Sequence, residues 1–343
     1  MDIFVLLIIS GFAYLLPKNP RDYLNPVSTK GLKGILAIGI ILHHLSQEVT
    51  TGDVFTNFAY MGSYIVSIFF FLSGYGLYVQ NSKSKTYLDN FFRKRLLKIL
   101  VPFISIWMIY LIYRIGVNKE SININYFIKL FTVGKTVIYN GWFIDVIILI
   151  YVLFYLSFKF VENKRVAIII NSILIIIYII VAIKLHYSFW WYNSILTFIL
   201  GLVWAKNKDK IDEVIENNLF MTLVSATFFM FIFHNYDIVL TKLDLTSSYM
   251  YALAANMDNL IFTLYFILLI KNINFDNKYL LALGGISFEL YMIHGLVIHY
   301  FGRYYISSKV NDVIFTIIVL VISIILAKLI NFGLKKATVK SNI

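Results

Sequence analysis

Apolar residues occur in long runs along most of the chain, and short polar segments separate the runs. A helix that crosses a bilayer needs about 20 mainly apolar residues, and ten runs come close to that length or exceed it. They are residues 33–50, 58–80, 96–115, 141–160, 166–184, 188–205, 219–235, 249–270, 280–302 and 312–332. The pattern therefore predicts an all-α fold, a polytopic bundle with ten transmembrane helices.

A shorter apolar run precedes these ten, at residues 3–16, and ends at Pro17. A run of this length suits a buried or interfacial helix as well as it suits a span. A secretory signal peptide fits less well, because Asp2 stands where such a peptide carries positive charge. We expect an N-terminal helix here and leave it out of the count of spans.

Composition supports a membrane location. Apolar residues make up 60% of the 343 residues and charged residues only 14%, whereas soluble domains carry about 25% charged residues. So few charges do not cover the surface of a soluble fold of this size, and we expect no nucleic-acid partner despite the net charge of +12. The absence of cysteine excludes disulfides, thiolate metal ligands and a cysteine nucleophile.

Lysine and arginine are divided unequally between the two alternating sets of loops. One set contains 21 of them and the other 8, while Lys328 lies inside a span. The richer set is residues 18–33, 83–98, 159–165, 206–210, 271–278 and 335–340. Cytoplasmic loops carry the excess of positive charge, so we expect a multi-pass plasma-membrane protein whose C-terminus is cytoplasmic. No loop is long enough for a soluble domain, and we treat residues 1–343 as one membrane domain.

Ionisable side chains inside a bilayer are costly and usually functional. Lys33 and His44 are eleven residues apart, so they share a helix face about 16 Å apart along the axis. Lys33 is then expected at the cytoplasmic boundary and His44, which follows His43, near mid-membrane. Glu48 follows four residues later and is expected to hydrogen-bond the His44 imidazole. The alternative is a buried polar pair that only ties helices together.

A basic cluster marks the start of the third predicted span. Arg93, Lys94, Arg95 and Lys98 place four cations within six residues. Membrane topology and anionic lipid explain such a cluster without any ligand. However, Arg95 and Lys98 continue into the helix at positions i and i+3, which suits binding of a phosphorylated ligand at the membrane face. Spacing alone leaves both interpretations open.

Further polar residues interrupt later spans. Ser287, Tyr291 and His294 fall at i, i+4 and i+7 and form a polar stripe on one helix face. This helix brings His294 to the depth of His44, so the two imidazoles are candidates to line one cavity. No spacing of ligands supports a metal site, and we expect none.

The remaining candidates lie in three separate segments. Trp142 and Asp145 open an inward-going helix, where tryptophan is also common as an interface anchor. Ser73 and Gly74 interrupt a phenylalanine-rich helix and favour close helix packing. His299 lies near a helix end and is typical of an interface residue.

Six segments, in this order, resemble the motifs of acyltransferase family 3. They are Lys33-x10-His44, Phe70 to Tyr75, Phe92 to Pro102, Trp142-Phe143, Phe198-x2-Gly201 and Ile286 to His294. Together they extend over nearly the whole chain. Lys33 stands where arginine is commoner in the family, and Asp145 is only a loose match to an acidic residue that many members carry. The esterase-like domain that some members append has no counterpart here.

The resemblance implies an integral membrane O-acyltransferase. Such an enzyme moves an acyl group, usually acetyl, from cytoplasmic acyl-CoA to a hydroxyl of a cell-surface or lipid-linked carbohydrate. Acyl-CoA is then a co-substrate rather than a permanently bound cofactor. A carrier or flippase for lipid-linked saccharides is the main alternative, although the chain lacks the inverted repeat typical of transporters.

The resemblance also suggests a role for each candidate residue. His44 would be the general base and Glu48 would orient it. The cations expected to bind the CoA donor are Lys33, Arg93, Arg95 and Lys98. The residues expected to bind the thioester or the acceptor are Ser73, Trp142, Asp145, Ser287, Tyr291 and His294.

Overall fold

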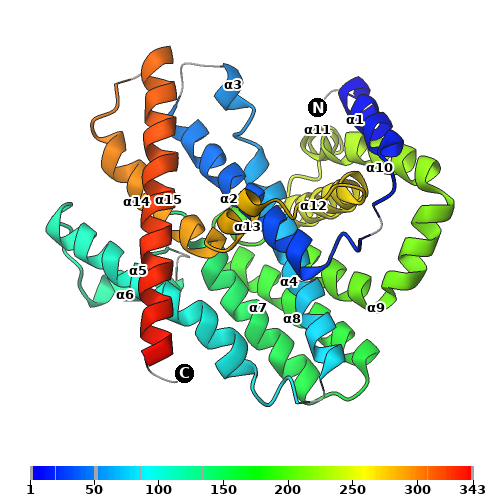
Figure 1. Ribbon diagram of the computed structural model, residues 1–343, viewed down its shortest axis with the longest axis horizontal. Helices are drawn as coiled ribbons and strands as arrows, with labels where there is room; N and C mark the ends of the chain where they lie inside the picture. The colour runs from blue at the N-terminus through cyan, green and yellow to red at the C-terminus, as the bar shows by residue number, and fades with distance from the viewer. Residues whose placement is uncertain are drawn as a thin grey trace. The chain divides into compact units, whose positions relative to one another are not determined.

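The computed structural model describes residues 3–19, 21–49, 53–84, 86–132, 135–306 and 308–340. These residues form helices joined by turns and loops, and the described part of the chain contains no β-strand. Figure 1 shows the helices in chain order, from α1 in blue to α15 in red. The expected all-α class is therefore confirmed.

The chain divides into two compact units, each made of three separate stretches. Unit 1 contains Met1–Thr29, Val66–Asn90 and Ile150–Asn274, and unit 2 contains Lys30–Ile65, Phe91–Leu149 and Phe275–Ile343. Three helices pass from one unit to the other along the chain: α2 (Pro26–Glu48), α4 (Met61–Lys83) and α7 (Trp142–Lys159). All the candidate functional residues except Ser73 belong to unit 2.

In unit 1, two glycines allow two helices to pack with their backbones in contact. Its own helices are α1 (Ile3–Leu15), α8 (Lys164–Lys184), η2 (Phe189–Trp191), α9 (Leu196–Asn217), α10 (Leu219–Phe233), α11 (Tyr236–Lys242) and α12 (Ser248–Ile270). A Cβ on Gly74 of α4 would lie 2.1 Å from the Phe198 carbonyl oxygen, and one on Gly201 2.2 Å from that of Phe71. The α4 and α9 backbones therefore touch, as small residues allow between membrane helices.

The short N-terminal run forms helix α1, which packs against α10 and α12. The Ser10 hydroxyl oxygen lies 2.8 Å from that of Thr227 and 3.0 Å from that of Tyr265. Tyr265 also donates a hydrogen bond to the Leu6 carbonyl at 3.0 Å. These buried bonds tie α1 to the rest of unit 1.

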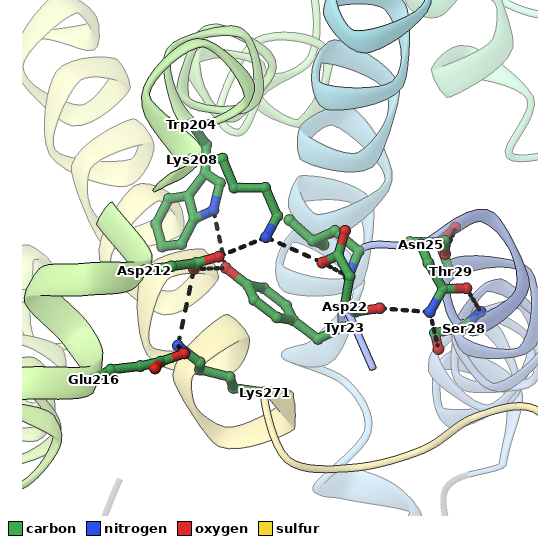
Figure 2. A network of polar contacts seen from close by, with 11 residues as sticks. Asp22, Tyr23, Asn25, Ser28, Thr29, Trp204, Lys208, Asp212, Glu216 and Lys271 are labelled. Atoms are coloured by element: carbon green, nitrogen blue, oxygen red, sulfur yellow. Dashed lines mark hydrogen bonds and ion pairs between the residues drawn. The ribbon is translucent and has the colours of Figure 1, made fainter. Parts of the chain in front are cut away.

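A charged network fixes the loop before α2 to the kinked end of α9 (Figure 2). The Tyr23 hydroxyl donates to Asp212 at 2.7 Å and accepts from the Trp204 indole at 3.1 Å. Lys208 Nζ lies 2.5 Å from Asp212 and 3.1 Å from Asp22. Burial and the hydrogen bond to Asp212 raise the pKa of Tyr23 well above its usual value, so this phenol stays protonated as a donor.

The same network continues to the end of α12. Lys271 Nζ lies 3.3 Å from Glu216 and 3.9 Å from Asp212, and Lys18 pairs with Glu216 at 2.5 Å. Asp212 and Glu216 stand one helical turn apart on α9, so one face of that helix presents both carboxylates. We call these residues, Asp22, Tyr23, Trp204, Lys208, Asp212, Glu216 and Lys271, the Tyr23 network.

In unit 2, close contacts at glycines hold α2 against α13 and the segment just before it. Its own helices are α3 (Asp53–Thr56), η1 (Phe92–Leu96), α5 (Leu97–Gly116), α6 (Ile124–Thr132), α13 (Lys278–Gly284), α14 (Ser287–Gly302) and α15 (Lys309–Lys340). A Cβ on Gly31 would lie 1.8 Å from the Phe275 carbonyl oxygen, and one on Gly284 1.8 Å from that of Lys30. Helix α14 packs along α15 and also contacts α5 (Figure 1).

Fewer helices than ten meet the length and hydropathy expected of a span. Among the described residues they are Met61–Lys83, Phe92–Gly116, Trp142–Lys159, Lys164–Lys184, Ser248–Ile270 and Lys309–Lys336. Two pairs of helices are bent, by 99° between α9 and α10 and by 69° between α13 and α14, and counting each pair as one span brings the number to at most eight. The predicted ten spans are not confirmed.

Helix α2 accounts for part of this difference. It replaces the predicted span 33–50, whose last residue lies outside the described residues, and it begins earlier, at Pro26. Two lysines, two histidines, Gln47 and Glu48 lie within its 23 residues, which makes it too polar to rank with the apolar spans. The helix with the most candidate chemistry is thus one of the least lipid-like.

Candidate functional site

Two imidazoles from different helices meet at the centre of unit 2. The rings of His44 on α2 and His294 on α14 stack with centroids 5.2 Å apart and planes 21° apart. The His43 ring lies 4.8 Å from that of His44. The structure therefore brings together the two histidines that were expected at one depth. We call His44 and His294 the histidine pair.

The hydrogen bonds of His294 define where its lone pair lies. Its Nδ1 atom is 3.3 Å from the Leu290 carbonyl oxygen, and because a carbonyl only accepts, Nδ1 carries the proton. The Nε2 atom then has the lone pair, and it is buried with no hydrogen-bond partner among the described residues. A buried acceptor left unpaired costs free energy, so this atom is well prepared to accept a proton from a ligand.

His44 has a different partner from the one expected. Its Nδ1 atom lies 3.4 Å from Gln47 Oε1, whereas Glu48 is exposed and its charge lies close enough to His299 to affect it. Positions i+3 and i+4 are both neighbours on a helix face. Both side chains are exposed, and it is the Gln47 amide that turns toward the imidazole. Gln47 thus replaces Glu48 as the contact of His44.

His43 has a separate role in packing. Its Nδ1 atom lies 3.0 Å from the Phe58 carbonyl oxygen, which fixes the ring against the turn before α4. A Cβ added to Gly62 would lie 2.4 Å from His43 Nε2, so only glycine fits there. These two contacts orient the ring next to His44.

Basic side chains gather at the N-terminal ends of α2 and α5. Lys33 and Arg95 are both half-buried, and their charges lie close enough to repel each other. Arg95 lies in η1, a single turn of π-helix that leads into α5, and such turns are frequent at functional sites. Two cations held close together form a natural place for an anion. The neighbouring Arg93 and Lys98 are exposed.

The start of α7 is fixed against α14 beside the histidine pair. Asn140 has a left-handed backbone with φ of 60°, and its carbonyl accepts a hydrogen bond from the Tyr291 hydroxyl at 2.8 Å. The Tyr291 ring lies 5.4 Å from that of Phe143 and 5.9 Å from that of His294. Asp145 is close enough to Tyr291 for its charge to act on the phenol.

Three of the expected binding residues lie away from the contacts of the histidine pair. The Ser287 hydroxyl donates to the Gly284 carbonyl at 3.1 Å, across the bend between α13 and α14. Ser73 lies on α4 in unit 1. Trp142, the first residue of α7, is half-buried in unit 2. Substrate binding by these three residues stays a prediction.

Some residues that build the site gave no signal in the sequence. Tyr110 on α5 donates to the Met292 carbonyl at 2.9 Å, and a Cβ on Gly295 would lie 2.7 Å from the Tyr139 carbonyl oxygen. The first contact holds α5 against α14, and the second holds the segment before α7 there. A tyrosine or glycine in an apolar helix does not reveal such a role.

Helices α2, α5 and α14 run in the same direction through unit 2, and pairs of contacts mark three levels along them. Lys33 and Arg95 lie at the first level, and the histidine pair lies at the second. At the third, the Tyr113 hydroxyl and His299 Nδ1 lie 3.0 Å apart. A ligand bound by its phosphates at the first level would extend about 16 Å to reach the histidines.

Comparison with known proteins gives one result for the chain as a whole. The acyltransferase family 3 model, which describes an acyltransferase domain, matches residues 27–332, nearly the full length. The curated proteins and the solved structures give no match. The matched region includes α2 and α14 with their histidines, as well as η1 with its arginines. The chain therefore belongs to acyltransferase family 3, and it is a multi-pass membrane acyltransferase.

Proposed function

We propose that this protein is an O-acyltransferase that moves an acyl group, most simply acetyl, from cytoplasmic acyl-CoA to a hydroxyl of a cell-surface or lipid-linked carbohydrate. The observation that carries the proposal is the histidine pair, in which His294 Nε2 is buried and unpartnered beside His44. A neutral imidazole near the reacting oxygen can serve as the general base for acyl transfer to a hydroxyl. The pair offers two of them.

The donor would bind at the first level of unit 2. Lys33 and Arg95 would bind phosphates of CoA, since two neighbouring cations favour a multiply charged anion. Arg93 and Lys98, which are exposed on the same segment, would add to the attraction. The extended pantetheine arm would carry the thioester along α2 toward His44.

The transfer step uses no group other than the two substrates and an imidazole. His44 takes the proton from the acceptor hydroxyl as the oxygen attacks the thioester carbonyl carbon. The tetrahedral intermediate collapses, the carbon–sulfur bond breaks, and the imidazolium returns the proton to the departing CoA sulfur. His294, stacked on His44 with an unpartnered Nε2, would accept a hydrogen bond from the acceptor and orient the attacking hydroxyl.

The proposed topology follows from the distribution of lysine and arginine. With ten spans and a cytoplasmic C-terminus in the plasma membrane, Lys33 and Arg95 would face the cytoplasm, and the third level would face outward. The acceptor would then approach from the outer side. Helix α2 would cross the bilayer in spite of its polar residues, because its neighbours in unit 2 would cover them.

The direct test is release of CoA thiol by the purified protein on addition of acetyl-CoA and a candidate polysaccharide. The chain contains no cysteine, so a thiol reagent detects product CoA without background from the protein. The proposal expects thiol release that depends on both substrates and an equal amount of ester on the sugar by mass spectrometry. A carrier or flippase would release no thiol with any acceptor, and that result would contradict the proposal.

A further inference from the structure

At the third level of unit 2, aromatic and arginine side chains contact one another in a cluster that has no part in the proposed transfer step. We call it the distal cluster, and it consists of Tyr113, Arg114, Tyr139, His299 and Arg303. His299 lies five residues after His294 on α14, about 7.5 Å further along the axis. The cluster is thus near the reacting groups and on the side opposite to Lys33 and Arg95.

The aromatic part of the distal cluster is held rigidly. The His299 ring stacks on Tyr139 with centroids 4.4 Å apart and planes 19° apart, and its Nδ1 atom lies 3.0 Å from the Tyr113 hydroxyl. Asn118 donates to the Tyr139 hydroxyl at 3.0 Å. Although these contacts fix it, His299 remains exposed, as does Tyr300 next to it, so aromatic surface is available to a ligand.

The two arginines of the distal cluster differ in their partners. Arg114 donates to Glu120 at 2.9 Å and to the Val137 carbonyl at 3.0 Å, and its guanidinium covers the Tyr139 ring at 4.3 Å. Burial alone would raise the pKa of Glu120, but hydrogen bonds from Asn118 and Arg114 outweigh it and lower that pKa. Glu120 is therefore ionised at neutral pH, and it neutralises Arg114.

Arg303 carries the charge that is left. It donates to the Asn118 side-chain oxygen and lies 5.5 Å from the centre of the Tyr113 ring. Among the described residues no carboxylate pairs with it, and it is exposed. A neutral amide and an aromatic face thus hold a guanidinium in place, and several of its N–H donors stay available. This arrangement suits bidentate recognition of a carboxylate or phosphate.

A second observation points to a ligand at the same place. The Tyr126 hydroxyl on α6 is buried and has no hydrogen-bond partner among the described residues. Its electrostatic neighbours are Arg114, Glu120 and Tyr139. A buried hydroxyl without a partner costs free energy, and a polyhydroxylated ligand at the distal cluster would supply the missing bond.

We infer that the distal cluster is the acceptor subsite and that it selects a saccharide bearing an acidic group, a carboxylate or a phosphate. Arg303 binds the acidic group, and the exposed faces of His299 and Tyr300 support the sugar ring. The inference rests on the proposed function for its role in acyl transfer, but binding itself is independent of catalysis. The acylated hydroxyl would lie about 7.5 Å from His299, within reach of the histidine pair.

The test measures saccharide binding by calorimetry, with the full chain in nanodiscs of phosphatidylcholine alone. The probes are a tetramer of glucuronic acid and a tetramer of glucose. We expect the acidic tetramer to bind at least about 10-fold more tightly, as for a charge-assisted pair. Arg303→Gln should abolish this preference and Arg303→Lys should weaken it, whereas Lys309→Gln, which removes an exposed charge six residues further along the chain, should leave it intact.

Three results would overturn the inference. The first is equal binding of the two tetramers, and the second is an equal effect of Arg303→Gln and Lys309→Gln. The third concerns thermal stability. If phosphatidylglycerol in the nanodiscs raises the melting temperature more than the acidic tetramer does, and this rise depends on Arg303, then Arg303 binds a lipid headgroup instead.

CoA binding on the same samples separates this inference from the proposed function. Preference for the acidic tetramer without any binding of CoA would support the subsite and contradict the proposed acyl transfer. Thiol release without a preference for the acidic tetramer would contradict the subsite alone.

Discussion

In unit 1 the charged side chains around Tyr23 lie next to opposite charges. In unit 2, polar groups around His44 lack such matching partners. The single carboxylate of Asp212 contacts three residues, Tyr23, Lys208 and Lys271. In unit 2, by contrast, His294 Nε2 has no hydrogen-bond partner among the described residues. Lys33 has the like charge of Arg95 near it.

The difference separates two uses of buried polarity. A closed network satisfies its members and favours one folded arrangement, so the Tyr23 network is expected to act on stability. A buried polar atom without a hydrogen-bond partner can still form a hydrogen bond with a ligand. Substitutions in the two regions should therefore affect different measurements, and four predictions follow this line from the largest effect to the smallest.

The largest effect is expected at the histidine pair. His44→Ala should lower the turnover number about 10²- to 10⁴-fold, the usual contribution of a general base, while the thermal unfolding temperature in detergent stays near that of the parent. His43→Ala is the matched control and should retain most activity. Near-normal turnover by a well-folded His44→Ala protein would refute the base assignment.

The donor cations should give the next effect. Arg95→Gln is expected to raise KM for acyl-CoA about 10-fold, as for a hydrogen bond to a charged group, with little change in KM for the acceptor. Since part of this attraction is Coulombic, the difference from the parent should shrink as salt is added. Lys94→Gln, at an exposed neighbouring position, serves as control. An equal rise in KM for both substrates would instead favour a role in membrane topology.

The Tyr23 network should respond in stability alone. Asp212→Asn keeps the size of the side chain but removes the partner charge of Lys208 and Lys271. The expected loss is about 1–3 kcal/mol in the free energy of unfolding, less than for a fully buried pair because Asp212 is 20% exposed. Thermal melts report it. An unchanged melting temperature with lost turnover would break the contrast between the two regions.

The smallest effect distinguishes Gln47 from Glu48. Gln47→Ala removes the contact at 3.4 Å to His44, and it should lower turnover about 2- to 10-fold, the worth of one hydrogen bond. Glu48→Ala should change turnover less, because Gln47 and not Glu48 contacts the imidazole among the described residues. Steady-state rates of the two variants decide between them, and the reverse order would restore Glu48 as the residue that orients His44.

The central part of the site was predictable because one helical repeat governs it. The eleven-residue spacing fixes the separation of Lys33 and His44, and the polar stripe on α14 places His294 at a similar depth. The pair then follows from two helices of known direction. What the repeat does not decide is which of two adjacent exposed side chains turns toward His44, so Gln47 was missed.

Other features depend on contacts between distant parts of the chain. Tyr23, Asp212 and Lys271 are separated by long stretches of sequence, and each is typical of an ordinary loop or helix end when taken alone. The carbonyl of Asn140 becomes a partner of Tyr291 through a left-handed backbone, which asparagine permits but does not require.

The central claim is that acyl groups enter at Lys33 and Arg95, pass the histidine pair and leave at the distal cluster. Sealed vesicles of known orientation test it most directly, with acetyl-CoA confined to the side of the C-terminus and the polysaccharide to the other. The account predicts CoA thiol on the C-terminal side and acetyl ester on the opposite side, both lost in His44→Ala. Ester formation only when both substrates are on the C-terminal side would contradict transfer through unit 2.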